Sequence, residues 1–373
     1  MAHADLARYA GQFVWLELNF DTAKNRAFLD KYGAVGTPTF YIIDPQDAKV
    51  VATESGAMSY AEFVSFLDRG AHMVLSRAQA PADLALARGD ALLARRPLEA
   101  AAAYRDALRL SPPGWPKREI AEASIVSALQ SGNQARICAE MAAKETSHMM
   151  RGPVFARTVI SGMWCLVSSD NKQWIKKQAQ TLRPLAEEAL SLRTTERDHR
   201  DELYRTLMIL ALSEDDRVTT AQWGDRWLTE LDAIRPTSDE ERMAVDIARV
   251  ESIDVFGDPK RILPALLDSE LAMPYSWNAS LRVAQMENKA RDSDATIAAC
   301  NRGLARSPGP LGKSWLLQIK ADALRTTGQP AEAERALEAA EQAALAIPLR
   351  RTRDNNLRQI RQALGSLSDK KDK

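Results

Sequence analysis

The run Thr39-Phe40-Tyr41-Ile42-Ile43 is followed by Asp44-Pro45-Gln46-Asp47 and then by Lys49-Val50-Val51-Ala52-Thr53. The first and third runs are rich in β-branched and aromatic residues, which favour strands, and the run between them has the composition of a turn. Two strand-prone runs joined by so short a turn predict an antiparallel hairpin with a four-residue loop. Because no comparable strand signal follows it, this hairpin decides where the β-containing part of the chain lies.

The segments around the hairpin predict a small α/β unit. Phe13–Leu18 is mostly apolar and predicts a buried strand, and Asp21–Tyr32 has helical spacing with Gly33 at the position of a C-cap. Ser59 has the residue type and position of an N-cap for one more helix. The predicted order is β-α-β-β-α. The last helix carries three apolar residues on one face: Phe63, Phe66 and Leu67.

Beyond Gly70 the composition shifts to Ala, Leu, Arg and Glu with helical periodicity, which predicts an all-α region. Helix pairs recur at a period of about 34 to 40 residues, as in helical repeat proteins. The clearest unit ends at Pro112 and contains Leu84, Ala87, Ala91, Ala100, Tyr104 and Ala107. A second copy near the end of the chain contains Leu317, Ala321, Leu324, Gly328, Ala333, Leu337 and Ala340.

The repeat pattern weakens between residues 153 and 274, where turn-forming residues still divide the chain into helices of ordinary length. Stacked helical hairpins predict an α-solenoid whose concave face binds a partner. The segment 349–367 predicts a terminal capping helix, and residues 366–373 predict a disordered tail. The predicted breaks are Asp170-Asn171, Pro184, Arg193-Thr194-Thr195, Asp215-Asp216, Pro236-Thr237 and Gly257-Asp258-Pro259.

Four blocks in the first seventy residues resemble the C-terminal part of a thioredoxin fold, and the helical units resemble tetratricopeptide repeats. The resemblance predicts a partial thioredoxin-like domain over 1–72, a tetratricopeptide-like α-solenoid over 80–365 and a tail over 366–373. The predicted fold class is therefore an α/β part followed by an all-α part. The four blocks are Leu18-Asn19-Phe20-Asp21, Lys31-Tyr32-Gly33, Gly36-Thr37-Pro38-Thr39-Phe40 and Gly56-Ala57-Met58-Ser59.

The thioredoxin resemblance implies a substrate-binding position at Thr37 and Pro38. In that family the proline is cis and the backbone beside it pairs with an extended substrate; the alternative is a trans proline that begins a strand. The Cys-x-x-Cys of the family is missing, because no cysteine precedes Cys138. We therefore predict no catalytic residue in this chain, and an enzyme only if the gene product extends upstream of Met1.

The missing half of the domain leaves two expectations for Phe13–Leu18. The segment either pairs directly with Thr39–Ile43 through a right-handed crossover, or it leaves an apolar edge exposed. A start codon assigned too far downstream, or a truncated domain, would explain the missing segment.

Composition excludes several classes of function. Fifty Lys plus Arg balance fifty Asp plus Glu, so no net field favours nucleic acid, and no apolar run reaches the length of a membrane span. The first residues lack a secretion signal, which predicts a cytoplasmic protein as written and a periplasmic or secreted one if the true start lies upstream. We predict no cofactor.

The cysteines and histidines predict neither a disulfide framework nor a metal site. Three cysteines are too few for such a framework, and core packing is the favoured interpretation for each. No histidine has a second ligand at a recognisable spacing. These residues are Cys138, Cys165, Cys300, His3, His72, His148 and His199.

The combined architecture is similar to that of chaperedoxins, bacterial proteins that join a thioredoxin domain to tetratricopeptide repeats. This resemblance implies a protein that binds other proteins or extended polypeptide segments, as a chaperone or in thiol redox homeostasis. Two alternatives stay open: a non-catalytic helical scaffold, and a thiol-disulfide oxidoreductase whose cysteines lie upstream of this chain.

Overall fold

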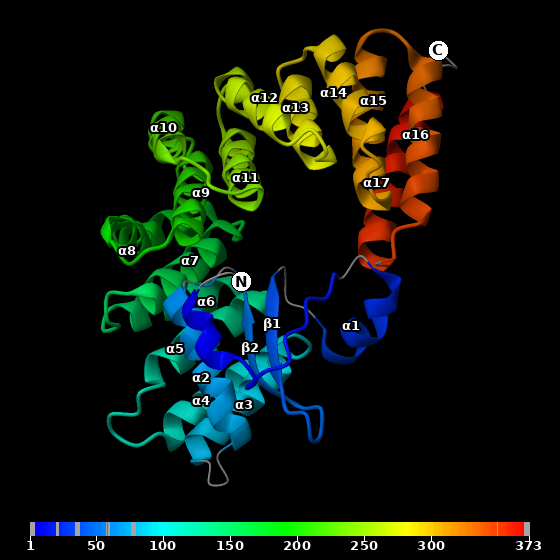
Figure 1. Cartoon of the computed structure of the whole chain (residues 1–373). Helices are drawn as coiled ribbons and strands as arrows, with labels where there is room; N and C mark the ends of the chain where they lie inside the picture. The colour runs from blue at the N-terminus through cyan, green and yellow to red at the C-terminus, as the bar shows by residue number, and fades with distance from the viewer. Residues whose placement is uncertain are drawn as a thin grey trace. The chain divides into compact units, whose positions relative to one another are not determined.

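The chain is mainly helical, with one two-stranded sheet among the described residues (Figure 1). Its contacts divide it into two compact units: unit 1 comprises Met1–Leu18 and Ala27–Thr220, and unit 2 comprises Asn19–Arg26 and Ala221–Lys373. The computed structural model describes residues 4–19, 22–33, 38–56, 58, 60–75, 80–348 and 350–368.

The predicted hairpin is confirmed. Strand β1 (Thr39–Ile43) pairs antiparallel with β2 (Val50–Ser55), with Tyr41 opposite Thr53. A register shift after Ile42 leaves β2 with one extra residue, as in a β-bulge. One face of the hairpin packs against helix α2 (Tyr60–Leu75) in a core cluster of Tyr9, Ile42, Ala52, Phe66 and Leu67.

The strand predicted for Phe13–Leu18 is wrong, because residues 13–19 have no regular secondary structure. No described strand pairs with them, and a lone apolar run cannot satisfy its backbone groups as a strand. Of the two expectations, the exposed apolar edge is the one found. The thioredoxin-like order β-α-β-β-α is therefore not observed in the described residues.

The other predicted elements of this region are present with shifted bounds. A 3-10 turn, η1 (Ala4–Tyr9), precedes residues 13–19, and η2 (Ala23–Asn25) leads into α1 (Arg26–Tyr32). Gly33 ends α1 with a φ of +80°, as its predicted C-cap role requires. Ser59 lies outside the described residues.

Unit 1 continues with helices that pack against their neighbours in sequence, such as α3 on α4 and α6 on α7. These helices support the predicted helical hairpins. Their bounds are α3 (Pro81–Leu93), α4 (Pro97–Leu110), α5 (Arg118–Ser131), α6 (Ala135–Thr146), α7 (Pro153–Val167), α8 (Lys172–Ser191) and α9 (Arg197–Ser213).

The α3–α4 hairpin closes around Tyr104, which is fully buried. Gly89 on α3 faces its ring so closely that an added Cβ would lie 2.3 Å from the Tyr104 Cε1 atom. The buried face of α3 is not the predicted one, since Leu84 is 50% exposed and Ala91 is exposed. The face contains Ala82, Leu86, Gly89, Asp90 and Leu93 instead.

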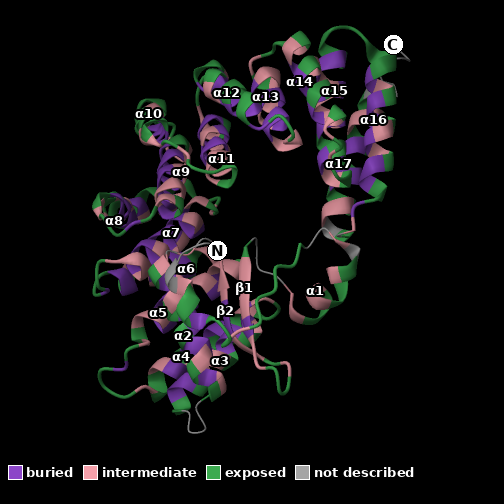
Figure 2. Cartoon of the chain, in the orientation of Figure 1, coloured by how far each residue is buried: buried purple, intermediate pink, exposed green. Residues whose placement is uncertain are grey.

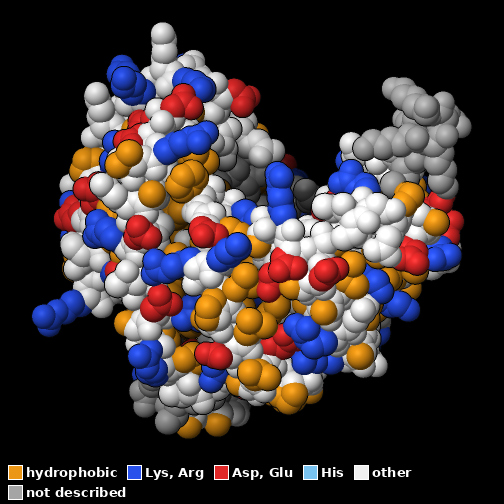
Figure 3. Space-filling view, turned by 90° about the horizontal axis from the view of Figure 1, so that it is seen from above, with side chains coloured by type: hydrophobic (Ala, Val, Ile, Leu, Met, Phe, Trp, Pro, Cys, Tyr) orange, Lys and Arg blue, Asp and Glu red, His pale blue; other side chains and the backbone are white. Residues whose placement is uncertain are grey.

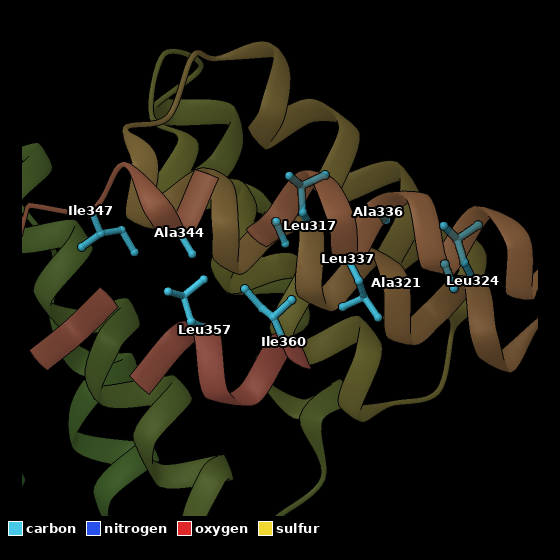
Figure 4. Packing of buried hydrophobic residues seen from close by; sticks show 11 residues of the cluster. Leu317, Ala321, Leu324, Ala336, Leu337, Ala344, Ile347, Leu357 and Ile360 are labelled. Atoms are coloured by element: carbon cyan, nitrogen blue, oxygen red, sulfur yellow. The ribbon is translucent and has the colours of Figure 1, made fainter. Parts of the chain in front are cut away.

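Unit 2 contains a second series of neighbouring helices, and its last hairpin matches the predicted copy. The predicted residues from Leu317 to Ala340 lie in one buried cluster, apart from Gly328, which forms the turn with a φ of +74° (Figure 4). The bounds are α10 (Arg217–Ala233, begun in unit 1), α11 (Asp239–Val255), η3 (Pro259–Arg261), α12 (Leu263–Ala272), α13 (Trp277–Lys289), α14 (Ser293–Ala305), α15 (Pro310–Thr326), α16 (Pro330–Leu345) and α17 (Arg350–Ser368).

Local sequence explains many helix starts. Proline occupies the first turn of α3, α4, α7, α15 and α16, where its missing N–H has no helical partner to lose. Side chains cap others: the Ser238 hydroxyl accepts from the Glu241 N–H at 3.1 Å. The break predicted at Pro184 is wrong, because α8 continues through it with buried residues on both sides.

The terminal helix α17 packs Leu357 and Ile360 into the same cluster as α15 and α16, as expected of a capping helix. Ser366–Ser368 extend this helix rather than beginning a tail, and residues 369–373 lie outside the described ones. Figure 2 shows buried and exposed residues alternating along the helices, as amphipathic packing requires. No helix among the described residues is long and apolar enough to cross a membrane.

Candidate functional site

The predicted binding position lies at the start of β1. Pro38 is exposed, and its carbonyl oxygen accepts a hydrogen bond from the Gly56 N–H at 2.9 Å. Because proline has no N–H with which to donate the second hydrogen bond of this pair, the β1–β2 ladder ends here. The carbonyl of Pro38 is therefore used inside the hairpin. Thr37, the other predicted residue, lies outside the described residues.

The backbone of β1 alternates between its two sides. The Pro38–Gly56 bond makes that pair a hydrogen-bonded one, so the pair two residues further on, Phe40 with Glu54, is of the same kind and Tyr41 with Thr53 is not. The N–H and C=O groups of Tyr41 consequently point away from β2. No described strand pairs with this outer edge of β1.

The outer edge of β2 is covered instead. Helix α3 packs against β2, and the backbone of Thr53 faces the buried carboxylate of Asp90 on that helix. The outer side of β2 is therefore covered by α3, whereas β1 has no second strand among the described residues.

Residues 13–19 place exposed apolar side chains in the same region. The ring centroids of Phe13, which is half-buried, and Trp15, which is 42% exposed, lie 5.7 Å apart, and Val14 and Leu16 are 88% and 71% exposed. Phe63 on α2 joins the two parts, since its ring lies 6.3 Å from that of Trp15 and 5.7 Å from that of Phe40. Exposed apolar side chains gathered in this way are common at sites where proteins bind partners. We call β1 together with residues 13–19 the open edge.

A buried ion network fixes the hairpin that carries the open edge. The Glu54 carboxylate of β2 lies 3.1 Å from an Arg69 guanidinium nitrogen of α2 and 2.6 Å from one of Arg157 of α7. Arg69 lies 3.6 Å from Asp90, which also accepts a 2.8 Å hydrogen bond from the Tyr104 hydroxyl. Four elements, α2, α3, α4 and α7, thus hold β2 in place.

The network divides its carboxylates by charge state. Burial acts to raise the pKa of Glu54, but Arg157 and Arg69 outweigh it and the pKa lies below its ordinary value. Burial raises the pKa of Asp90 to about 6, with Arg69 opposing the shift. Glu54 is therefore ionised throughout the neutral range, whereas Asp90 gains a proton near pH 6. Buried ion pairs add little net stability, but removing one partner is costly, so the network fixes position.

The cysteines differ from the prediction in one respect. All three are buried as predicted, but Cys138 of α6 and Cys165 of α7 form a disulfide across that helix pair. Burial raises the pKa of the Cys300 thiol to about 12. A buried disulfide and a buried protonated thiol are poor nucleophiles, so none of the three has the environment of a reactive thiolate.

Charged side chains of both signs are mixed on the surface. Figure 3 shows Lys and Arg side chains interspersed with Asp and Glu over the face it displays, in keeping with fifty residues of each sign.

Comparison with models of protein families, and with curated proteins, finds no match to this chain.

Proposed function

We propose that this chain binds an extended segment of another polypeptide along the open edge. The observation that carries the proposal is the outer side of β1, which no described strand covers, beside the exposed side chains of Val14 and Leu16. A partner strand would pair with the backbone of Tyr41 and place alternate apolar side chains against residues 13–19. Backbone pairing supplies affinity for many sequences, and the apolar contacts favour segments of alternating hydrophobicity.

The ion network supports this proposal by holding the edge rigid. A strand that adds to a fixed template loses only its own conformational freedom, whereas adding to a mobile hairpin would require ordering both partners. Glu54 sits on the strand next to β1 and is bound from two helices. The edge is therefore preorganised for an extended ligand.

The partial thioredoxin-like resemblance supports the same class of function, because it also implies an extended substrate near Pro38. The tetratricopeptide-like helices and the similarity to chaperedoxins add the proposal of a chaperone that binds many clients. A scaffold would instead hold one folded partner in fixed stoichiometry, and an oxidoreductase would need cysteines beyond this chain.

The disulfide adds a proposal on compartment. Disulfides persist in oxidising compartments and are rare in the cytosol. Cys138 and Cys165 therefore favour the periplasmic or secreted alternative over the cytoplasmic prediction.

The test of binding combines fluorescence polarisation with hydrogen exchange. A labelled peptide of alternating Val and Thr should bind the chain, and Val14→Lys and Leu16→Lys should each weaken binding by about tenfold, as loss of one buried aliphatic side chain implies. Val218→Lys on α10, also an exposed valine, is the matched control and should bind as the parent does.

Hydrogen exchange followed by mass spectrometry locates the bound strand. Peptide binding should slow exchange in fragments covering residues 38–44 and leave α3 unchanged. Binding with unchanged exchange in β1 would refute the open edge as the site, and binding of one folded protein but no peptide would favour the scaffold. Turnover of insulin disulfides by this chain would favour the oxidoreductase.

A further inference from the structure

Apart from the open edge, one cluster of potential ligand atoms stands out in unit 1. Glu122 of α5, Glu145 of α6 and His148 just after α6 bring one ligand atom each to within 4.8 Å of one another. Among the described residues this is the one group of three His, Cys, Asp or Glu side chains so arranged. The prediction of no metal site rested on spacing along the chain, and Glu122 is brought to the other two by helix packing.

The atoms converge in a specific way. The His148 Nε2 atom lies 3.3 Å from the Glu122 Oε2 atom and 3.5 Å from the Glu145 Oε2 atom. A tetrahedral Zn²⁺ ion with bonds near 2.0–2.1 Å sets its ligand atoms about 3.3–3.5 Å apart. The two separations to the imidazole therefore already match the edges of a zinc tetrahedron.

The remaining carboxylate oxygens are occupied by cations on the outside of the cluster. The Glu122 Oε1 atom lies 3.6 Å from Arg118, and the Glu145 Oε1 atom lies 3.0 Å from Lys144. Each carboxylate thus turns one oxygen to a basic side chain and the other to His148. These outer contacts orient the inner oxygens, as supporting residues do around bound metals.

Burial argues that the inner oxygens need a cation. The side chains of Glu122 and Glu145 are only 3% and 9% exposed, and two buried like charges repel each other. A proton on His148 Nε2 can form one well-aligned hydrogen bond, whereas a metal ion binds all three atoms at once. The His148 side chain is 51% exposed, so an ion can reach the cluster from solvent.

We propose that Glu122, Glu145 and His148 bind one Zn²⁺ ion, with a water molecule as fourth ligand. One imidazole and two carboxylates suit zinc and its neighbours in the first transition row, whereas Mg²⁺ prefers oxygen ligands alone in octahedral geometry. The ion would join α5 to the end of α6. It is independent of polypeptide binding at the open edge.

Isothermal titration calorimetry of the chelator-treated full chain tests the proposal. Zn²⁺ should bind with a stoichiometry of one, Mg²⁺ should not compete, and Co²⁺ should show the strong visible absorption of a tetrahedral site. His148→Ala and Glu145→Gln should each weaken Zn²⁺ binding by more than about 100-fold, beyond the cost of losing a mere supporting residue.

Two control variants separate this site from adventitious binding. Glu140→Gln removes an exposed carboxylate from the same helix, and His72→Ala removes a histidine from α2. Both should bind Zn²⁺ as the parent does. The proposal is overturned if the parent binds no Zn²⁺, or if His148→Ala binds it equally well, with circular dichroism showing that the variant is folded.

Discussion

Breaking the disulfide between Cys138 and Cys165 should lower the stability of unit 1. The bond closes a loop over a sequence separation of 27 residues. The loop-closure entropy of a chain of that length corresponds to about 3.5 kcal/mol at 25 °C. That value is a large fraction of the 5–15 kcal/mol that separates a typical folded domain from its unfolded state. Reduction should therefore shift unfolding of unit 1 to clearly lower denaturant concentration.

The assay is urea unfolding with and without a thiol reductant, followed by circular dichroism. The double variant Cys138→Ala/Cys165→Ala should unfold early in both conditions. Cys300→Ala is the matched control, because it removes a buried cysteine outside the disulfide and should keep the response to reductant. Coincident curves for the oxidised and reduced parent would refute the loop argument. Alkylation of all three cysteines in the unreduced, unfolded chain would refute the disulfide itself.

Three further predictions concern the ion network and the α3–α4 hairpin. The pKa of Asp90 is about 6 in the folded state and 3.8 in its ordinary environment, so the folded state binds this proton more tightly than the unfolded state does. Protonated Asp90 therefore adds about 3 kcal/mol to the free energy of unfolding. This contribution is complete below pH 4 and is lost as the pH rises through 6. Asp90→Asn should flatten that part of a plot of unfolding free energy against pH, and an unchanged slope would contradict the assignment. Arg157→Met should destabilise the chain by about 3–5 kcal/mol in urea unfolding, because Glu54 loses a buried partner, and adding Glu54→Gln should recover part of the loss; strict additivity of the two would show that they do not interact. Gly89→Ala should lower the free energy of unfolding by about 1–3 kcal/mol and lower the thermal midpoint, because the added Cβ would overlap the Tyr104 ring. A higher midpoint would show that α3 and α4 can move apart to make room for it.

The sequence was sufficient for elements whose signals are local. The β-hairpin follows from residues 39–53, the inner face of α2 from the spacing of Phe66 and Leu67, and the last helical hairpin from small and large residues at fixed offsets. In each case the buried face of the element is apolar, so the spacing of hydrophobic residues along the sequence identifies it directly.

It was insufficient where a polar residue is buried or where a partner comes from another element. The buried face of α3 includes Asp90, and a search for apolar spacing therefore selected Leu84, which is exposed. Phe13 to Leu18 has the composition of a strand, but strand formation needs a neighbour that the described residues do not supply.

Paired side chains from different helices escaped prediction for the same reason. Cys138 and Cys165 lie on separate helices, and no spacing rule pairs them. The Glu145-x-x-His148 spacing was readable as one helical turn, yet Glu122 joins it only because α5 packs against α6.

Helix α7 connects two kinds of restraint. Arg157 near its start binds Glu54 of the hairpin, and Cys165 near its end is bonded to α6. Under mechanical load applied from the N-terminal side, the ion pair between Glu54 and Arg157 would break, whereas the covalent bond between Cys138 and Cys165 would hold. The loop closed by the cysteines, whose sequence separation is 27, would contribute no contour length while the bond is intact, and reduction would release about 90 Å of extended chain. In a pulling experiment the segment from Cys138 to Cys165 would therefore extend only after the disulfide is reduced.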